Sequence, residues 1–113
     1  MKKLVLTLLL TSSVIWASGE QIVQTNGCMD CHNIIGKKLA PAFAGIGRKN
    51  IQWYGADAKS KIIESIKNGS KGKYRQFADS EMPAYGHLSS VEIETIANWI
   101  LEEYEKNKQL MKR

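Results

Sequence analysis

The sequence predicts a single all-α domain, built of three or four short helices that are joined by long loops. Apolar residues recur at three- and four-residue steps from Ile93 to Tyr104, and a shorter apolar stripe runs from Ile62 to Ile66. No segment shows the apolar–polar alternation that is typical of a half-buried strand. A chain of 113 residues has room for one domain.

The first residues are typical of a secretory signal peptide. Two lysines precede an apolar run that begins at Leu4, and small residues follow from Ala17 to Gly19. We expect cleavage between Ala17 and Gly19, which divides the chain into a signal peptide, 1–19, and a domain, 20–113. The stretch from Leu4 to Ala17 has 14 residues, whereas a spanning helix needs roughly 20. Export to the periplasm without stable membrane insertion is therefore expected, and an uncleaved anchor is the alternative.

The beginning of the domain is expected to contain one short helix and a long loop. The helix should run from Glu20 to about Asp30. The segment 33–47 is expected to be mostly loop, with Phe43 and Ile46 directed to the interior. Such a long loop is uncommon in a compact domain unless a functional group organises it.

The later elements have clearer boundaries. A helix is predicted to start at Asp57, a residue type that favours the N-cap position, and to end at Asn68, because glycine follows it. Residues 70–81 lack apolar periodicity and are expected to form a surface loop. Ser89 and Glu92 have the spacing of a capping box, which predicts the start of the last helix. That helix should end near Lys106.

The residues Cys28-Met29-Asp30-Cys31-His32 form the C-x-x-C-H pattern of covalent haem attachment. Two thiols three positions apart can each add to one of the two vinyl groups at a haem edge, and the next imidazole can then reach the iron. Cys28 and Cys31 are therefore the candidate attachment residues for one haem c, and His32 is a candidate iron ligand. Two alternatives are a thiol–disulfide redox pair and a zinc site, which would need a further ligand such as His87.

A low-spin haem electron carrier also needs an iron ligand from the opposite side. Met82 is the best candidate, because it follows His32 by fifty residues in a predicted loop, and Pro83 favours an extended conformation for the residue before it. His87 is the rival. The other methionines are poorly placed, in the signal peptide, between the cysteines and beyond the last helix: Met1, Met29 and Met111.

Taken in order, the motifs resemble a class I cytochrome c of the short bacterial monohaem type. They are Cys28-Met29-Asp30-Cys31-His32, Pro41-Ala42-Phe43, Ile66-Lys67-Asn68-Gly69-Ser70, Met82-Pro83 and Ile96-Ala97-Asn98-Trp99-Ile100. The resemblance implies the cytochrome c fold, in which the first and last helices cross and Trp99 packs at the crossing. It also implies that the Pro41 carbonyl accepts a hydrogen bond from His32 and so orients the imidazole ring.

The sequence departs from this family at the residues that would face the haem propionates. Relatives often carry an arginine at the position of Ser65 and a tryptophan at the position of Tyr74. Tyr74 can still donate a hydrogen bond and is a candidate for this role, but Ser65 is too short. Ala40 stands where the family usually has glycine, and Tyr85 stands where relatives can have an asparagine near the methionine sulfur.

The resemblance implies a function in electron transport rather than catalysis. The protein would shuttle single electrons in the periplasm, between respiratory complexes or to a terminal oxidase or reductase. Three rivals stay open at this point. They are a haem enzyme that acts on peroxide, a subunit of a larger haem complex, and a haem-free thiol redox module.

The charge pattern predicts the kind of partner. Ten basic and two acidic residues lie between Lys37 and Arg75, whereas seven acidic residues and no base lie between Asp79 and Glu105. One interpretation is a generic solvated surface. The other is a basic face that steers the protein towards redox partners with acidic docking surfaces. Nucleic acid is not an expected partner, because the sequence is exported and has no nucleic-acid motif.

Overall fold

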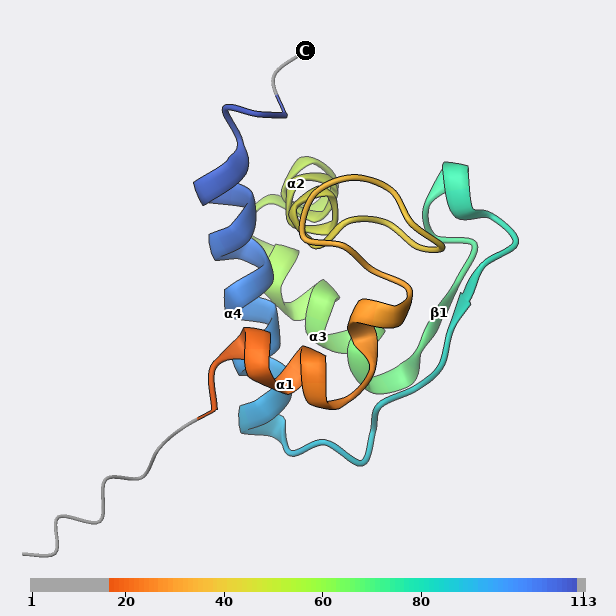
Figure 1. The fold of residues 1–113 in the computed structure, drawn as a ribbon, viewed down its shortest axis with the longest axis vertical. Coiled ribbons are helices and arrows are strands. Elements are labelled where there is room, and N and C mark those ends of the chain that lie inside the picture. The colour runs from red at the N-terminus through yellow and green to blue at the C-terminus, as the bar shows by residue number, and fades with distance from the viewer. Residues whose placement is uncertain (1–16, 112–113) are drawn as a thin grey trace, which may run out of the picture.

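A computed structural model describes residues 17–111, so most of the predicted signal peptide lies outside the described residues. Within this range, four α-helices form the fold (Figure 1), which confirms the predicted all-α class. The elements in chain order are α1 Gly19–Thr25, the 3₁₀ turn η1 Cys28–Asp30, α2 Phe43–Tyr54, the 3₁₀ turn η2 Gly55–Asp57, α3 Ala58–Asn68, β1 Ser70–Lys71, the 3₁₀ turn η3 Arg75–Phe77, β2 Glu81–Met82 and α4 Ser90–Asn107. None of the helices in this part of the chain combines the length and the apolar character that crossing a membrane requires.

Helix α1 is shorter than the predicted helix. Ser18 Oγ accepts a hydrogen bond from the Gln21 backbone N–H at 3.2 Å, and the Gln21 side chain accepts one from the Ser18 N–H at 2.9 Å. This capping box satisfies two N–H groups at the start of the helix. The helix ends at Thr25 rather than near Asp30, because Gly27 adopts a φ of 73° and turns the chain into η1.

Two residues before Glu20 make contacts within the fold, and the domain boundary at Glu20 stays a prediction. Ser18 caps α1, and Gly19 is buried against α4, where an added Cβ would lie 2.3 Å from Trp99 Cβ. Both residues lie inside the predicted cleavage window. Cleavage after Ala17 would retain them in the mature chain, whereas cleavage after Gly19 would remove them.

Helix α2 was not predicted, so the expectation of loop up to Gly47 is wrong from Phe43 onwards. Gly45 and Gly47 lower the intrinsic helix propensity of this segment, and a propensity argument therefore misses the helix. Gly47 instead allows close packing, because a Cβ there would lie 2.8 Å from Tyr104 Cβ on α4. Contact with α4 therefore outweighs the weak local preference.

The boundaries of α3 are close to those predicted, but its start is made differently. Asp57 occupies the N-cap position, yet its side chain makes no capping hydrogen bond. The turn η2 leads directly into the helix, and Ser60 Oγ donates to the Asp57 carbonyl at 2.8 Å. At the other end Gly69 has a φ of 79°, as expected for a glycine that follows a helix. The short β1–β2 ribbon that follows was not predicted.

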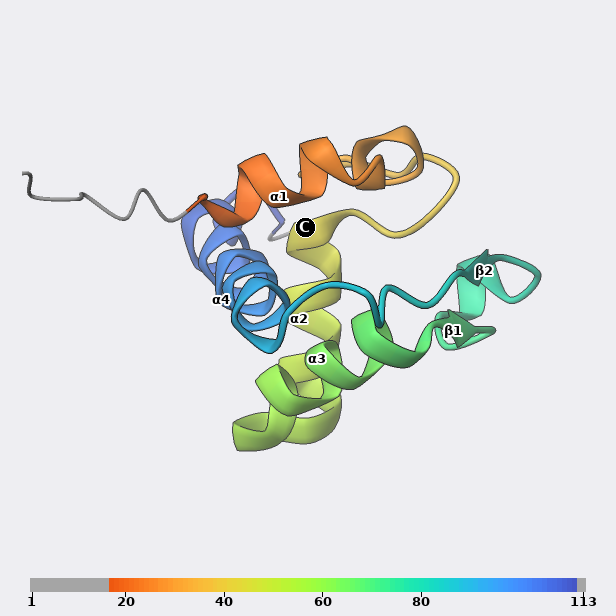
Figure 2. The same ribbon diagram turned by 90° about the horizontal axis from the view of Figure 1, so that it is seen from below.

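Helix α4 and its crossing with α1 agree with the prediction. Ser89 and Glu92 form the expected capping box, and the helix ends at Asn107, one residue after the predicted Lys106. Figures 1 and 2 both show α1 lying across α4. Trp99 packs at this crossing and is 7% exposed.

The apolar core lies between the four helices. Its buried members are Ile22, Val23, Phe43, Ile62, Ile66, Ile93, Ile96, Ala97, Trp99 and Ile100. In Figure 2 the loop after η1 and the β1–β2 ribbon lie on the far side of the molecule from α4. The core opens into a cavity between these two segments.

The two glycines of α2 provide a matched test of the packing between α2 and α4. Gly47→Ala would place a Cβ 3.0 Å from the Ile100 carbonyl oxygen as well as close to Tyr104, and it should lower the free energy of unfolding by about 1–3 kcal/mol. Gly45→Ala meets no atom within 4 Å and should raise it by about 0.5–1 kcal/mol. Denaturant unfolding of both variants measures the difference. Equal effects would show that α2 does not approach α4 this closely.

Candidate cofactor-binding site

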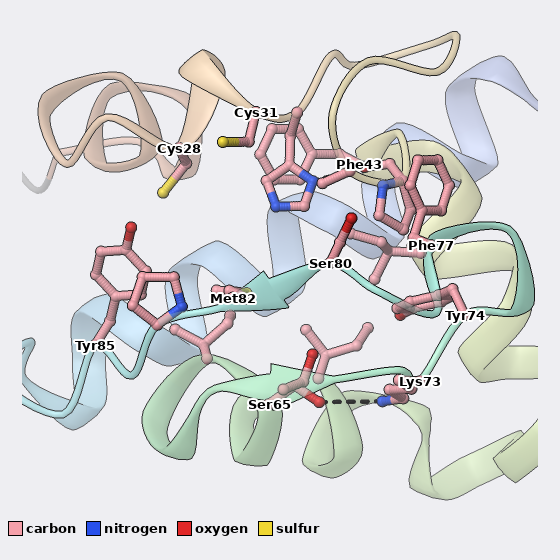
Figure 3. Close-up of a pocket in the computed structure, with 18 of the residues that line it drawn as sticks. Cys28, Cys31, Phe43, Ser65, Lys73, Tyr74, Phe77, Ser80, Met82 and Tyr85 are labelled. Atoms are coloured by element: carbon pink, nitrogen blue, oxygen red, sulfur yellow. Dashed lines mark hydrogen bonds between the residues drawn. The ribbon is translucent and has the colours of Figure 1, made fainter.

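A cavity with mainly apolar walls opens between η1, α2, α3 and the segment 70–85 (Figure 3). Its apolar walls include Val23, Phe43, Ile46, Ile62, Ile66, Ile96 and Ile100. All the site residues predicted from the sequence line this one cavity: Cys28, Cys31, His32, Pro41, Tyr74 and Met82. The fold therefore brings together residues that lie far apart in the sequence. Their roles towards a cofactor stay predictions.

Cys28 and Cys31 lie at one end of the cavity (Figure 3). The backbone N–H groups of Cys31 and His32 both donate to the Cys28 carbonyl, at 3.3 and 3.0 Å, so the motif forms a tight turn. The two cysteines form no disulfide with each other; Cys28 is half-buried and Cys31 is exposed. Burial raises the pKa of the Cys28 thiol above its usual value, so the sulfur keeps its proton at neutral pH. A protonated thiol would supply both the sulfur and the hydrogen that add across a vinyl double bond of the haem.

His32 is held in one orientation and one tautomer. Its Nδ1 lies 2.6 Å from the Pro41 carbonyl oxygen, which can only accept, so Nδ1 carries the hydrogen and Nε2 keeps a free lone pair. The hydrogen bond expected between these residues is therefore present. The ring stacks on Phe43 with the centroids 4.8 Å apart. Burial lowers the pKa of His32, although the bond to Pro41 opposes this shift, and the neutral imidazole is the form that binds a metal.

Met82 reaches the cavity from the β1–β2 ribbon, in which it pairs with Ser70. Gly69 allows this close approach, because a Cβ there would lie 2.7 Å from the Met82 carbonyl oxygen. Figure 3 shows Met82 across the cavity from Cys31. His87, the rival ligand, is exposed and is not among the described residues that line the cavity. Met82 therefore lines the cavity and His87 does not, and the role of Met82 as iron ligand stays a prediction.

The end of the cavity away from Cys28 is polar, and Figure 3 shows Lys73 and Tyr74 there. Tyr74 Oη accepts a hydrogen bond from Asn50 Nδ2 at 3.0 Å. Burial raises the pKa of Tyr74 to about 12, so its hydroxyl keeps its proton at neutral pH. Lys73 Nζ donates to Asn50 Oδ1 at 3.0 Å and to Ser65 Oγ at 3.1 Å.

Sequence reasoning identified Tyr74 at this end but missed Asn50 and Lys73. Lys73 adjoins Tyr74, but it looked like one of many bases in a surface loop. Asn50 belongs to α2, the helix that was not predicted, and its side chain is 0% exposed. Asn50 and Lys73 are 23 residues apart in the sequence, and only the hydrogen bond between them shows that they meet at the cavity.

The groups around the cavity fit a covalently attached haem. Two thiols, a neutral imidazole and a thioether are the groups that attachment and axial ligation need, and the walls between them are apolar. A zinc site is not supported, because residues 17–111 contain no group of three or more His, Cys, Asp or Glu side chains that could hold a metal ion. Cys28 and Cys31 would form the covalent bonds, and His32 and Met82 would ligate the iron.

Comparisons with known proteins agree with this interpretation. The family model for cytochrome c matches residues 16–103. Cytochrome c-551 of Pseudomonas denitrificans is 34% identical over 87 residues, which cover 75% of this chain and 96% of that protein. Cytochrome c-552 of Hydrogenobacter thermophilus is 31% identical over 102 residues, which cover 89% and 97%. The crystal structure of wild-type cytochrome c552 of Nitrosomonas europaea is similar with a TM-score of 0.63 at 28% identity, over 74% of this chain and 96% of that one.

The raised pKa of Tyr74 predicts a stability that depends on pH. Tyr74 shifts from its usual 10.0 to about 12 in the folded state, so above its usual pKa the unfolded chain loses a proton that the folded chain still holds. This contribution to stability is complete below pH 10 and is lost as the pH rises to about 12. The free energy of unfolding should therefore fall more steeply over this interval than it does in Tyr74→Phe. Parallel urea titrations measure both proteins, and equal declines would contradict burial of the hydroxyl.

Proposed function

The chain belongs to the cytochrome c family and carries one covalently attached haem c, and on this premise we propose that it is a single-electron carrier of the periplasm. The electrons would pass between respiratory complexes or to a terminal oxidase or reductase. The observation that carries the proposal is the single cavity that both His32 and Met82 line. His32 stacks on Phe43, and Met82 comes from the ribbon across the cavity.

The proposed role follows from what these side chains do around the iron. When bound, the haem supplies an iron that alternates between the ferrous and ferric states. His32 Nε2 and the Met82 sulfur would both ligate the iron, and with two protein ligands it would have no place for a substrate. The Pro41 carbonyl fixes the orientation of His32 and raises the basicity of Nε2. The soft sulfur of Met82 would favour ferrous iron and so raise the reduction potential.

The face that would meet a partner lies beside the cysteine turn. Lys38 Nζ donates to the Met29 carbonyl at 3.0 Å, which holds a positive charge next to the attachment residues. Leu39 is 68% exposed and lines the mouth of the cavity. An apolar contact flanked by a cation suits a brief encounter with an acidic redox partner. Elsewhere in the basic stretch the charge is partly neutralised, as in the 2.7 Å pair of Lys59 with Glu94.

Replacement of Met82 by alanine tests the axial ligands. In a host that attaches haem, Met82→Ala should keep covalent haem, because both cysteines remain, but it should lose the far-red methionine–iron absorption band and become high-spin or fall in potential. His87→Ala is the matched control and should keep the spectrum of the parent protein. An unchanged Met82→Ala spectrum would sink the proposed ligand pair. A parent protein whose pigment is extracted by acid acetone would contradict covalent attachment, and one that lacks the band and reacts rapidly with peroxide would favour the enzyme.

Charge removal at Lys38 tests the docking face. Oxidation of the reduced protein by ferricyanide, a highly charged anion, should be slower in Lys38→Gln than in the parent protein at low salt, and the two rates should converge as salt screens the charges. Lys106→Gln is the control, because Lys106 lies in the last turn of α4 and has a side chain that is 75% exposed. If both variants slow the reaction equally, the positive charge acts through the whole molecule and not through this face.

A further inference from the structure

We propose that Lys73 is the cation that binds a haem propionate, with Asn50 as the residue that positions it. Lys73 Nζ lies in the cavity wall and donates to Asn50 Oδ1 and Ser65 Oγ, at 3.0 and 3.1 Å. It would supply the charge that relatives often take from an arginine at the position of Ser65. The proposal rests on the function proposed above, because it takes the haem as bound.

The charge of Lys73 has no partner of opposite sign within the described chain. No carboxylate oxygen of residues 17–111 lies within 4.0 Å of Lys73 Nζ; the salt bridges in this range involve other lysines. The ammonium is also partly withdrawn from water, and burial lowers its pKa more than the nearby Glu64 carboxylate raises it. A half-buried cation without a counter-charge is unfavourable. A carboxylate that entered this end of the cavity would supply the missing charge.

Hydrogen-bond donors remain for such a carboxylate. An ammonium has three N–H groups, and those of Lys73 make two hydrogen bonds within the described chain. Tyr74 Oη accepts from Asn50, so its own O–H is left to donate. Two donors from adjacent residues therefore remain at one end of the cavity, and two donors match the two oxygens of one carboxylate.

Asn50 fixes this arrangement from α2. Its side chain is 0% exposed, and Nδ2 donates to both the Ile46 carbonyl, at 2.8 Å, and Tyr74 Oη, at 3.0 Å. Its Oδ1 is therefore turned towards Lys73. The ammonium also lies 5.6 and 5.8 Å from the ring centroids of Tyr54 and Tyr74, which further confines it.

The position of the polar end of the cavity agrees with the arrangement of the side groups on a haem. A haem carries its two vinyl groups on one part of its rim and its two propionates on another. Figure 3 shows Cys28 and Cys31 at one end of the cavity, with Lys73 and Tyr74 at the far end. A haem joined to the two thiols through its vinyl groups would direct its propionates away from the cysteines, towards the end of the cavity where Lys73 and Tyr74 lie.

The reduction potential of the bound haem should depend on the charge of Lys73, so its measurement tests the proposal. A cation beside the haem disfavours the additional positive charge of the ferric state, so Lys73→Met in the haem-loaded protein should lower the midpoint potential. Lys73→Arg should keep the midpoint potential of the parent protein. The double variant Ser65→Arg with Lys73→Met should restore the potential, because the arginine at position 65 returns a cation to the same wall. Lys71→Met is the matched control, because Lys71 is exposed, carries the same charge and does not line the cavity.

The outcomes separate this proposal from the one before it. If the potential of Lys73→Met equals that of the parent protein, or falls no further than that of Lys71→Met, the assignment of Lys73 is wrong while the electron-carrier function stands. If Lys73→Met does not fold, Lys73→Gln replaces it, because the amide keeps a donor without the charge and should show the same lowered potential. Failure of the parent protein to attach haem, or the absence of its methionine–iron band, would instead overturn the proposed function.

Discussion

Trp99 connects the crossing of α1 and α4 to the cavity, and the geometry of the site depends on this contact. On one side the indole leaves room only for a residue without a Cβ, which is Gly19. On the other side its ring meets Phe43 edge-on at 4.9 Å, and Phe43 stacks on His32 at 4.8 Å. A row of packed groups thus runs from the helix crossing to the imidazole. Because protein interiors are close-packed, a shift of α1 against α4 would move the surface on which His32 rests.

The cavity also shows where a cofactor would complete the core of so small a domain. A chain of this length buries a modest apolar area and often needs a metal, a disulfide or a cofactor to complete its core. Here the buried side chains line the space from several helices, while Met82 approaches from the short β1–β2 ribbon and Tyr74 from the loop between its two strands. Bound haem supplies apolar surface for the walls and charge for the polar end. Folding and cofactor attachment are therefore linked, since much of the interior is completed by the ligand.

The sequence predicted the parts of the molecule whose signals are local. Ser89 and Glu92 cap α4 as their spacing indicates, and the C-x-x-C-H motif and the methionine before proline lie in one cavity. Helix α2 was missed because Gly47 is a poor helix former in isolation and becomes favourable only against α4. Asn50 and Lys73 were missed for a related reason. Their position at the cavity depends on a contact between two segments that are distant in the sequence, and neither residue belongs to a sequence pattern that would indicate this contact.

If the signal peptide is cleaved as predicted, the position of the cleavage affects the capping box of α1. Trimming after Ala17 would turn the Ser18 amide into a terminal ammonium, which can still donate to Gln21 but adds a cation at the positive end of the helix dipole. Trimming after Gly19 would discard the cap and the glycine that fits under Trp99. The predicted cleavage site would thereby determine how firmly the segment before the cysteines is held against α4. A processing error of two residues would act as a packing mutation.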